Sequence, residues 1–423
     1  ELGRLKGSVV KIGQMMALFG EHFLPEEVTE ALHTLENSTT ALEWPAVEKH
    51  LRQQLGSVKL AELEVDPQPL GAASLGHSHP VLTQAITEQA GKLIQNPNAG
   101  FTYSPYRAAL LQVLKPVLPV NLSKLYFVNS GAEANDVALK LARKITGRSK
   151  VISTLRAFHG RTYNTLSVSR GLDNTDRYVP KQVGNVFVPF NDMAALAAQL
   201  DGETAAVIIE PIQGEGGVQI PDPDYLIQVQ RLCRDQGALL IVDEIQTGFC
   251  RTGKFFALEH SSEPIEPDLL TMGKGIAGGF PFACLAVSAA VAEKIAIDDH
   301  GGTYCGNPLG CAISTTVINY LLCNDVIARV KTSGDFLSEN LHSLQRSFPA
   351  LVKEVRGIGL LCAIEFFDHA LSRSLTLACA EKGLLVVPTR NGIIRLLPDL
   401  LVTQSDMGKG IAILRQVLID LDR

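Results

Sequence analysis

One lysine and one aspartate in this chain are placed where they could serve an aldehyde cofactor. Lys274 lies in the glycine-rich segment MGKGIAGG, residues 272–279, and Asp243 ends an apolar run that continues as EIQTG. The glycines remove side-chain bulk and let backbone and ligand approach closely. Lysine is the usual Schiff-base former with pyridoxal phosphate, and an acidic side chain commonly pairs with its pyridinium nitrogen. The pair therefore predicts pyridoxal phosphate chemistry, with Lys274 and Asp243 as the catalytic residues.

Asp243 needs a cationic partner, because an unpaired carboxylate at the end of an apolar run is costly to bury. A structural arginine and a pyridinium nitrogen would both satisfy it. With the second partner, the protonated ring becomes an electron sink for a substrate carbanion. In that interpretation Gln246 supports the oxygen substituent of the ring and Ile245 packs against its face.

The segment NSGA, residues 129–132, follows a β-rich run and begins a predicted helix. Helix N-termini present unpaired N–H groups and the positive end of the helix dipole, and they bind phosphate for that reason. Taken alone, Ser130 is more simply an N-cap residue. The lysine and the aspartate described above favour the phosphate interpretation for Ser130, Gly131 and Ala132.

Three further segments carry candidate site residues. Phe158 and His159 follow a predicted strand, where an aromatic ring can stack on a planar cofactor, although Phe158 alone reads more simply as a core residue. Glu210 and Glu215 lie in EPIQGEGG, residues 210–217, either as solvated acids of a tight turn or as groups beside the ring and at the substrate entrance. Arg395 lies in an apolar strand pattern, where its planar fork suits a substrate carboxylate or a structural ion pair.

Short β-rich runs alternate with helical stretches from about residue 120 to 290, which predicts a mostly parallel sheet covered on both faces. A helix should follow the first run, with Ala134, Ala138, Leu141 and Ile145 on one face. Asp224 could begin a later helix and Gly237 could end it. Ligands of such sheets bind beyond the carboxyl ends of the strands, where Ser130, Glu210 and Asp243 fall. The expected strands are residues 124–128, 151–153, 186–188, 205–209 and 238–242.

The remaining parts of the chain differ from this pattern. One long helical stretch is expected over roughly residues 308–347, followed by shorter α and β segments that include a strand at 393–396. These predict a small α+β domain. The first 56 residues are helical in pattern and carry no strand signal.

The composition of the 423 residues is that of a packed globular protein, with 46% hydrophobic and 19% charged residues. The net charge of −6 gives no reason to expect nucleic acid or an anionic membrane as a partner. No apolar run is long enough for a membrane helix, and no secretory signal opens the chain. Because the first residue is Glu1, the sequence suggests a piece of a longer polypeptide.

Eight cysteines are scattered through the chain without a C-x-x-C pair. In a chain of this size they indicate reduced thiols in a cytoplasmic protein, without a disulfide framework or a metal site.

The order of these motifs resembles the class III aminotransferases, the subgroup of fold-type I enzymes that includes ornithine, acetylornithine and 4-aminobutyrate aminotransferases. The resemblance covers about residue 75 to the end. It rests on LGHSHP (75–80), NSGAEAN (129–135), FHGRT (158–162), the 210–217 loop, 242–253, the glycines around Lys274 and TYCGNP (303–308). Gly302 and Cys305 differ from the residues usual around Thr303 in that family, and Asp136 stands where glutamate is common.

The resemblance implies a role for each matched position. Lys274 would form the Schiff base and move the proton between substrate and cofactor, while Phe158 or His159 would stack on the ring. Thr303 would reach the phosphate of the neighbouring subunit, which implies a homodimer. The implied cofactor-binding residues are Ser130, Gly131, Ala132, Phe158, His159, Glu210, Asp243, Ile245, Gln246, Lys274 and Thr303.

The same resemblance implies how substrates are bound. Arg395 would grip a carboxylate of glutamate or 2-oxoglutarate, and Glu215 would act as the gate that neutralises Arg395 when another substrate binds. Tyr103 matches an aromatic residue near the substrate pocket.

The residues before Leu75 lack the aspartate-rich turn and short strand of that family and instead resemble the N-terminal part of ABC1, or UbiB-like, atypical kinases. The KIGQ segment at 11–14, Leu24-Pro25 and the PLGAAS segment at 69–74 carry this second resemblance. The catalytic lysine and metal-binding aspartate of those kinases have no counterpart. A non-catalytic helical segment joined to the enzyme within residues 71–77 is therefore expected.

Three hypotheses follow for the function. The first is a pyridoxal-phosphate-dependent aminotransferase, passing an amino group from an amino acid or amine donor to a keto acid or aldehyde. The second keeps the cofactor but performs a mutase, racemase or decarboxylase reaction. The third is a binding or scaffold protein with a relic site. The expected fold is α/β, with a helical segment at 1–74, a large domain at 75–307 and a small domain at 308–423.

Overall fold

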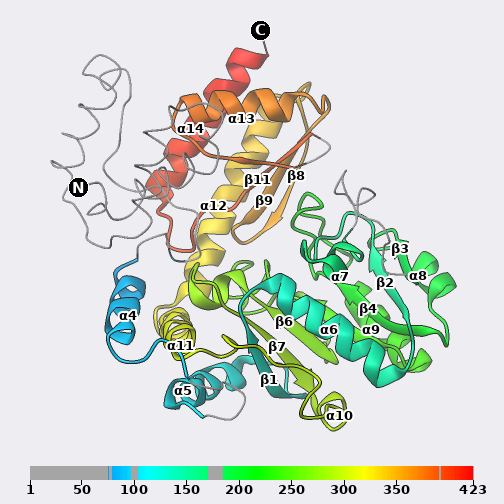
Figure 1. Cartoon of the computed structure of the whole chain (residues 1–423). Coiled ribbons are helices and arrows are strands. Elements are labelled where there is room, and N and C mark those ends of the chain that lie inside the picture. Colours follow the sequence, from blue (N-terminus) through cyan, green and yellow to red (C-terminus); the bar gives the residue numbers. More distant parts are fainter. Residues whose placement is uncertain (1–74, 76–78, 97–102, 170–183, 390–391, 423) are drawn as a thin grey trace, which may run out of the picture. The chain divides into compact units, whose positions relative to one another are not determined.

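The computed structural model describes residues 75, 79–96, 103–169, 184–389 and 392–422. Residues 72–423 form one compact unit, which contains two β-sheets and the helices that cover them (Figure 1). The helical segment expected at residues 1–74 lies outside the described residues.

The larger sheet has seven strands in the order β1-β7-β6-β5-β4-β2-β3. All neighbouring pairs are parallel except those of β7, which runs antiparallel to both β1 and β6. The five predicted strands are confirmed, and the sequence analysis missed the sixth and seventh. The strands are β1 (Leu122–Val128), β2 (Lys150–Thr154), β3 (Asn185–Val188), β4 (Thr204–Ile209), β5 (Leu239–Asp243), β6 (Leu269–Met272) and β7 (Ala283–Ser288).

Burial of the central strands explains their apolar sequences. Every residue of β4 and of β7 is buried, as expected for strands covered on both faces. Helix α6 (Gly131–Thr146) covers one face, and its predicted inner residues Ala134, Ala138 and Leu141 are buried, with Ile145 packed beside them. Its start is fixed by the Ser130 N-cap, which accepts a hydrogen bond from the Glu133 N–H.

Helix α9 (Tyr225–Gln236) ends as predicted at Gly237, whose φ of 63° is left-handed. At the other end Asp224 occupies the N-cap position as predicted, but its side chain forms no capping bond. Asp224 has helical dihedral angles and makes no side-chain capping bond, because its carboxylate accepts a hydrogen bond from Ser262 instead.

The helical stretch expected at 308–347 is two helices, not one. Helices α11 (Pro308–Cys323) and α12 (Val326–Ser347) meet at a bend of 69°, where Asp325 adopts a left-handed φ of 52°. Aspartate tolerates this conformation better than most residues, so the helix ends and restarts there. Among the described residues, no single helix is long and apolar enough to cross a membrane, and only this bent pair meets those criteria together.

A four-stranded antiparallel sheet, in the order β10-β11-β9-β8, follows α12 and confirms the expected α+β character and the strand at 393–396. Its elements are β8 (Val352–Ile358), β9 (Leu361–Phe366), α13 (Leu371–Glu381), β10 (Val387–Pro388), β11 (Ile393–Leu396) and α14 (Gln404–Leu421).

Shorter elements connect these layers. Helices α4, α5 and α11 each begin with a proline, which has no N–H to leave unpaired at a helix start. The connecting elements are α4 (Pro80–Ala90), α5 (Pro105–Leu114), η3 (Lys115–Val117), α7 (Tyr163–Leu166), α8 (Met193–Gln199), η5 (Ala257–His260), η6 (Lys274–Ala277) and α10 (Ala289–Ala292).

Candidate active site

Strand direction brings the predicted site residues to one edge of the large sheet. Strands β1 and β6 both run antiparallel to β7, and β4, β5 and β6 are parallel to one another. The carboxyl ends of β1, β4, β5 and β6 therefore lie at the same edge. Ser130, Asp243 and Lys274 lie at or just after three of these ends, as a site in such a sheet requires.

Asp243 is 4% exposed, and three neighbouring groups hold its carboxylate in place. Its Oδ2 lies 2.7 Å from the Asn135 side-chain nitrogen and 2.7 Å from His159 Nδ1. Its Oδ1 accepts a hydrogen bond from the Ile245 N–H at 3.0 Å. The carboxylate is thus fixed in orientation at the carboxyl end of β5.

Asn135 is a site residue that the sequence analysis missed. It lies on α6, fully buried, and donates to both Asp243 and the His159 carbonyl, at 2.7 and 2.8 Å. It also accepts a hydrogen bond from the Thr271 hydroxyl of β6 at 2.7 Å. A polar residue beside Ala134, which lies on the inner face of α6, was the available signal, since buried polar groups are nearly always paired.

Lys274 is exposed to solvent, whereas residues 271–273 and 275–278 around it are buried. Among the described residues, its ammonium has neither a hydrogen-bond partner nor an ion-pair partner. Desolvation by the surrounding protein lowers the pKa of Lys274, while Glu215 and Asp243 act in the opposite direction. The side chain is accessible to a ligand, yet the surrounding protein desolvates its ammonium, as a nucleophilic amine requires.

The backbone of Lys274 adopts a φ of 41°, in the left-handed region that a non-glycine residue rarely occupies. Such conformations persist where the surrounding structure imposes them, often at functional sites. Here Gly273 permits the close packing, because a Cβ on it would lie 3.2 Å from Ile245 Cγ2.

The start of α6 is open toward solvent. Ser130 is exposed, and Gly131 and Ala132 are half-buried, so that the first N–H groups of the helix are available to a ligand. A Cβ on Gly131 would lie 2.8 Å from two carbon atoms of Ile245, so Ile245 fills the space between α6 and Lys274's segment.

Glu210 links Phe158, the candidate for stacking on the ring, to the glycine-rich loop 210–217. It is 5% exposed and accepts hydrogen bonds from the Phe158 N–H at 3.0 Å and the Gly214 N–H at 3.2 Å. Burial raises its pKa to about 7, and Asp243 adds to this while His159 opposes it. Phe158 itself is half-buried, with the Arg161 guanidinium carbon 6.0 Å from its ring centroid.

His159 and Gln246 have partners other than those expected from the sequence. His159 is buried, and the contact of its Nδ1 with Asp243 places it beside that carboxylate. The Gln246 side-chain oxygen accepts a hydrogen bond from Arg395 at 3.0 Å.

Arg395 and Glu215 form the ion pair that the family resemblance implied, at 2.7 Å. The Arg395 side chain is 4% exposed and that of Glu215 is 38% exposed. The Nε of Arg395 is buried without a hydrogen-bond partner among the described residues. A buried cation is thus balanced by a carboxylate that reaches the surface.

Thr303 and Tyr103 are not brought to this group within the single chain. Thr303 is exposed, and its backbone carbonyl accepts a hydrogen bond from the Gln95 side chain. Tyr103 is 97% exposed.

The donor set fits pyridoxal phosphate. Asp243 offers a buried anion for a ring cation, Lys274 an unpartnered amine, and the start of α6 a set of free N–H groups. Gly131 and Gly273 leave room for Ile245 between Lys274 and the start of α6, because a Cβ on Gly131 would lie 2.8 Å and one on Gly273 3.2 Å from Ile245. The arrangement is complementary to a planar, cationic ring that carries an aldehyde and a phosphate.

Known proteins are similar to this chain in sequence over most of its length. The family model described as "Aminotransferase class-III" matches residues 68–418. The acetylornithine aminotransferase of Vibrio cholerae is 37% identical over 83% of this chain and 88% of that protein. The acetylornithine aminotransferase of Methanocaldococcus jannaschii is also 37% identical, over 84% and 88%.

Solved structures give the same result. The crystal structure of the ornithine aminotransferase of Toxoplasma gondii ME49 superposes with a TM-score of 0.78 and 32% identity, covering 84% of this chain and 85% of that one. The acetylornithine aminotransferase of Elizabethkingia anophelis gives 0.71 and 31%, covering 83% and 87%. The family match begins at residue 68, slightly before the start inferred from the motifs.

Proposed function

Because the chain belongs to the class III aminotransferase family and is a pyridoxal-phosphate-dependent transaminase, we propose that glutamate and 2-oxoglutarate are one of its substrate couples. The observation that carries this proposal is the ion pair of Arg395 with Glu215. A guanidinium fork binds a carboxylate through two parallel hydrogen bonds. A dicarboxylic substrate would displace Glu215 and take its place on Arg395.

The partial exposure of Glu215 supports its role as a gate. Arg395 is buried in a β-strand and cannot move far, whereas Glu215 lies in the glycine-rich loop 210–217 and is 38% exposed. A substrate without the second carboxylate would leave the pair closed, so that the buried cation is never left without an anion. The two states let one site accept two different substrates.

The second substrate is proposed from the relatives. Proteins named acetylornithine aminotransferase and ornithine aminotransferase lead the sequence and structure comparisons. We assign to this chain an amine donor of that chemical class, a primary amine at the end of an aliphatic chain, with a keto acid or aldehyde as acceptor.

Bound pyridoxal phosphate would supply an electron sink for the substrate carbanion. The residues of this chain hold and move the protons. Asp243 would keep the ring nitrogen cationic, and Asn135 and His159 fix the orientation of its carboxylate. Lys274 is the amine that holds the cofactor and the base that carries a proton to and from the substrate carbon, a task that its lowered pKa favours.

The remaining sites complete the proposal. Phe158 is assigned to the ring face, since His159 is occupied with Asp243. Ser130, Gly131 and Ala132 are assigned to the phosphate, supported by their exposure at the start of α6. We assign Thr303 and Tyr103 to a homodimer interface that completes the site, which their exposure in the single chain supports.

The organisation of the chain is proposed as a large domain at 75–307 and a small domain at 308–423, preceded by the segment 1–74. We assign a non-catalytic role to that segment. The family model begins at residue 68, inside that segment. A cytoplasmic location is proposed on the cysteines, all eight of which are free thiols.

Kinetics of Arg395→Ala test the substrate proposal. Loss of a charge-assisted hydrogen bond of about 1.5–3 kcal/mol should raise the KM for 2-oxoglutarate by roughly 10–100-fold. Arg373→Ala, at an exposed arginine in α13, is the control and should leave this KM unchanged. An unchanged KM in Arg395→Ala would contradict the assignment of the glutamate couple, while turnover with another acceptor would preserve the family's chemistry.

A further inference from the structure

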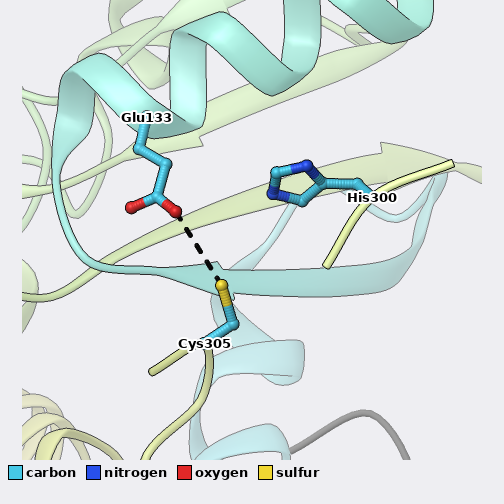
Figure 2. Close-up of side chains that lie close together, drawn as sticks. All are labelled: Glu133, His300 and Cys305. Carbon is cyan, nitrogen blue, oxygen red and sulfur yellow. Dashed lines mark hydrogen bonds between the residues drawn. The ribbon is translucent and has the colours of Figure 1, made fainter. Parts of the chain in front are cut away.

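Three side chains with metal-binding atoms converge beside the first turn of α6. Glu133 belongs to that turn, and His300 and Cys305 belong to the loop between α10 and α11. Their ligand atoms all lie within 4.8 Å of one another, and Cys305 Sγ lies 3.8 Å from Glu133 Oε1. Figure 2 shows the His300 ring edge and the Cys305 thiol both directed toward the Glu133 carboxylate.

We propose that Glu133, His300 and Cys305 form a binding site for a divalent ion of the zinc type. Thiolate, imidazole and carboxylate are the ligands that zinc prefers, and three protein ligands leave a fourth position for water. With ligand-to-zinc distances of about 2.0–2.3 Å, ligand atoms on one tetrahedral ion lie roughly 3.3–3.8 Å apart. A separation at the 4.8 Å bound would therefore have to shorten by about 1 Å. The loop has room at Gly301 for such a movement, since nothing lies within 4 Å of a Cβ placed there.

The free atoms of the three side chains are those that an ion would use. Glu133 Oε2 accepts hydrogen bonds from the Asn129 N–H and side-chain amide, which leaves Oε1 toward Cys305. His300 Nε2 is buried and has no hydrogen-bond partner among the described residues. Buried polar atoms without a partner are rare and call for a ligand, an ion or water.

Gly302 makes room for the thiol in this cluster. A Cβ on Gly302 would lie 2.6 Å from Cys305 Sγ and 3.8 Å from Glu133 Oε1. Any side chain at this position would therefore push the thiol out of the cluster.

The charges balance when the ion binds. Without an ion, the Cys305 thiol lies beside the Glu133 carboxylate, with Sγ 3.8 Å from Oε1. An incoming divalent cation replaces the thiol proton, which passes to solvent, and the thiolate and carboxylate together neutralise the ion. No oxidant or reductant is required.

Lys140 opposes this site, and that opposition makes the proposal testable. Its ammonium lies 3.1 Å from His300 Nδ1 and donates to the Asp299 carbonyl at 2.7 Å. While Nδ1 accepts from Lys140, the ring proton is on Nε2. An ion on Nε2 requires that proton on Nδ1, so Lys140 must turn away. Removal of Lys140 should therefore strengthen ion binding.

Equilibrium dialysis of the reduced holoenzyme against Zn²⁺, in a buffer free of phosphate, measures the site directly. We expect one ion per chain in the wild type, and at least a tenfold weaker affinity in Cys305→Ser, on the scale of losing a zinc ligand or its support, roughly 10–100-fold. Cys323→Ser, at an exposed cysteine outside the cluster, is the matched control and should bind like the wild type. Lys140→Met should bind more tightly.

A second variant keeps all three ligands. Gly302→Ala adds only the Cβ that displaces the thiol, and it should weaken Zn²⁺ binding as Cys305→Ser does. With Co²⁺ as the probe, the wild type should show thiolate-to-cobalt charge-transfer absorption that both variants lack. Equal ion content in the wild type and Cys305→Ser, or weaker binding in Lys140→Met, would overturn the proposal.

Discussion

At the scale of single residues, Lys274 combines accessibility with the absence of a partner. It is exposed between buried neighbours, and its backbone is held at a φ of 41°. Lysines on protein surfaces ordinarily carry no such strain. The motif around Lys274 predicted its role, because its glycines and its distance from Asp243 are readable in the sequence, whereas the left-handed backbone is not.

Replacing Lys274 by alanine should abolish transamination and the covalent link to the cofactor, because no other amine occupies its position. The measurement is the mass of the borohydride-treated holoenzyme, which should include the cofactor in the wild type and not in the variant. Lys254→Ala, at an exposed lysine of the same half of the chain, should retain the adduct. A full adduct on Lys274→Ala would show that a different lysine is used.

Asp243→Asn should lower kcat by orders of magnitude, because the amide has nearly the same shape but no charge to keep the ring nitrogen cationic. The cofactor content of the purified variant, measured after acid release, separates loss of chemistry from loss of binding. Asp235→Asn, at an exposed position of α9, provides the comparison. Wild-type kcat in Asp243→Asn would disprove the electron-sink role.

At the scale of elements, Asn135 joins three of them. It lies on α6, bonds to Asp243 at the end of β5 and accepts from Thr271 of β6. Sequence periodicity placed α6 and β5 correctly but did not reveal β6, which is a four-residue strand. The partner of Asn135 on β6 could therefore not be predicted, since a hydrogen bond between distant elements leaves no local pattern.

Asn135→Ala should destabilise the protein by about 1–3 kcal/mol, because it leaves the carboxylate and the threonine hydroxyl without their partner. Its kcat should fall as well, since Asp243 loses a fixed orientation. Chemical unfolding and steady-state kinetics check both effects. Asn340→Ala removes an asparagine of α12 whose side chain donates to the Phe336 carbonyl, and it should leave kcat unaltered. A normal kcat in Asn135→Ala would mean that His159 and the Ile245 N–H suffice.

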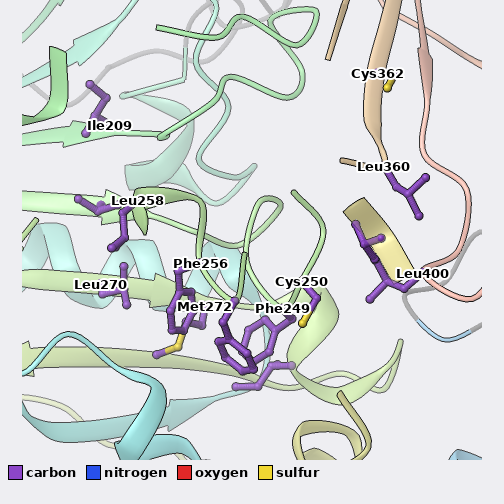
Figure 3. Close-up of a cluster of buried hydrophobic side chains, with 14 of the residues drawn as sticks. Ile209, Phe249, Cys250, Phe256, Leu258, Leu270, Met272, Leu360, Cys362 and Leu400 are labelled. Atoms are coloured by element: carbon purple, nitrogen blue, oxygen red, sulfur yellow. The ribbon is translucent and has the colours of Figure 1, made fainter. Parts of the chain in front are cut away.

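At the scale of the whole molecule, the two sheets share one apolar core. Figure 3 shows buried side chains from the large sheet and the loop after β5 beside residues near the small sheet. Phe249 packs edge-to-face on Phe255 and Phe256, at centroid distances of 5.5 and 5.8 Å. The loop that follows Asp243 is thereby anchored to the core.

Fold class and most strands followed from the sequence, because alternation of apolar strands and amphipathic helices is a local signal. The break between α11 and α12 did not, since Asp325 reads as an ordinary helix residue until its left-handed φ is known. The pairing of Arg395 with Glu215 was predictable only through the family resemblance. These residues are far apart in the chain, and no periodicity relates them.

Buried Glu244 should make stability depend on pH. Burial raises its pKa from 4.5 to about 7, so the folded state holds a proton that the unfolded state releases. The stability that Glu244 contributes is therefore fully present below about pH 4.5, and this contribution is lost as the pH rises through about 7. Glu244→Gln mimics the protonated form. Relative to the wild type, its free energy of unfolding should rise between pH 5 and 8 by up to about 3 kcal/mol, at about 1.4 kcal/mol per pKa unit.

Urea unfolding at both pH values checks this prediction. Glu339→Gln, at an exposed position of α12, should show no such difference from the wild type between the two pH values. If the free energies of unfolding of Glu244→Gln and the wild type differ by the same amount at pH 5 and pH 8, the carboxyl of Glu244 does not titrate in this range.

The most direct test of the central claim is the absorbance spectrum of the purified holoenzyme before and after addition of glutamate. The account predicts that the visible band of the bound cofactor decreases, that a near-ultraviolet band replaces it, and that each site releases one 2-oxoglutarate. An unchanged spectrum without 2-oxoglutarate would contradict the assignment of Arg395 and Glu215 to the glutamate couple.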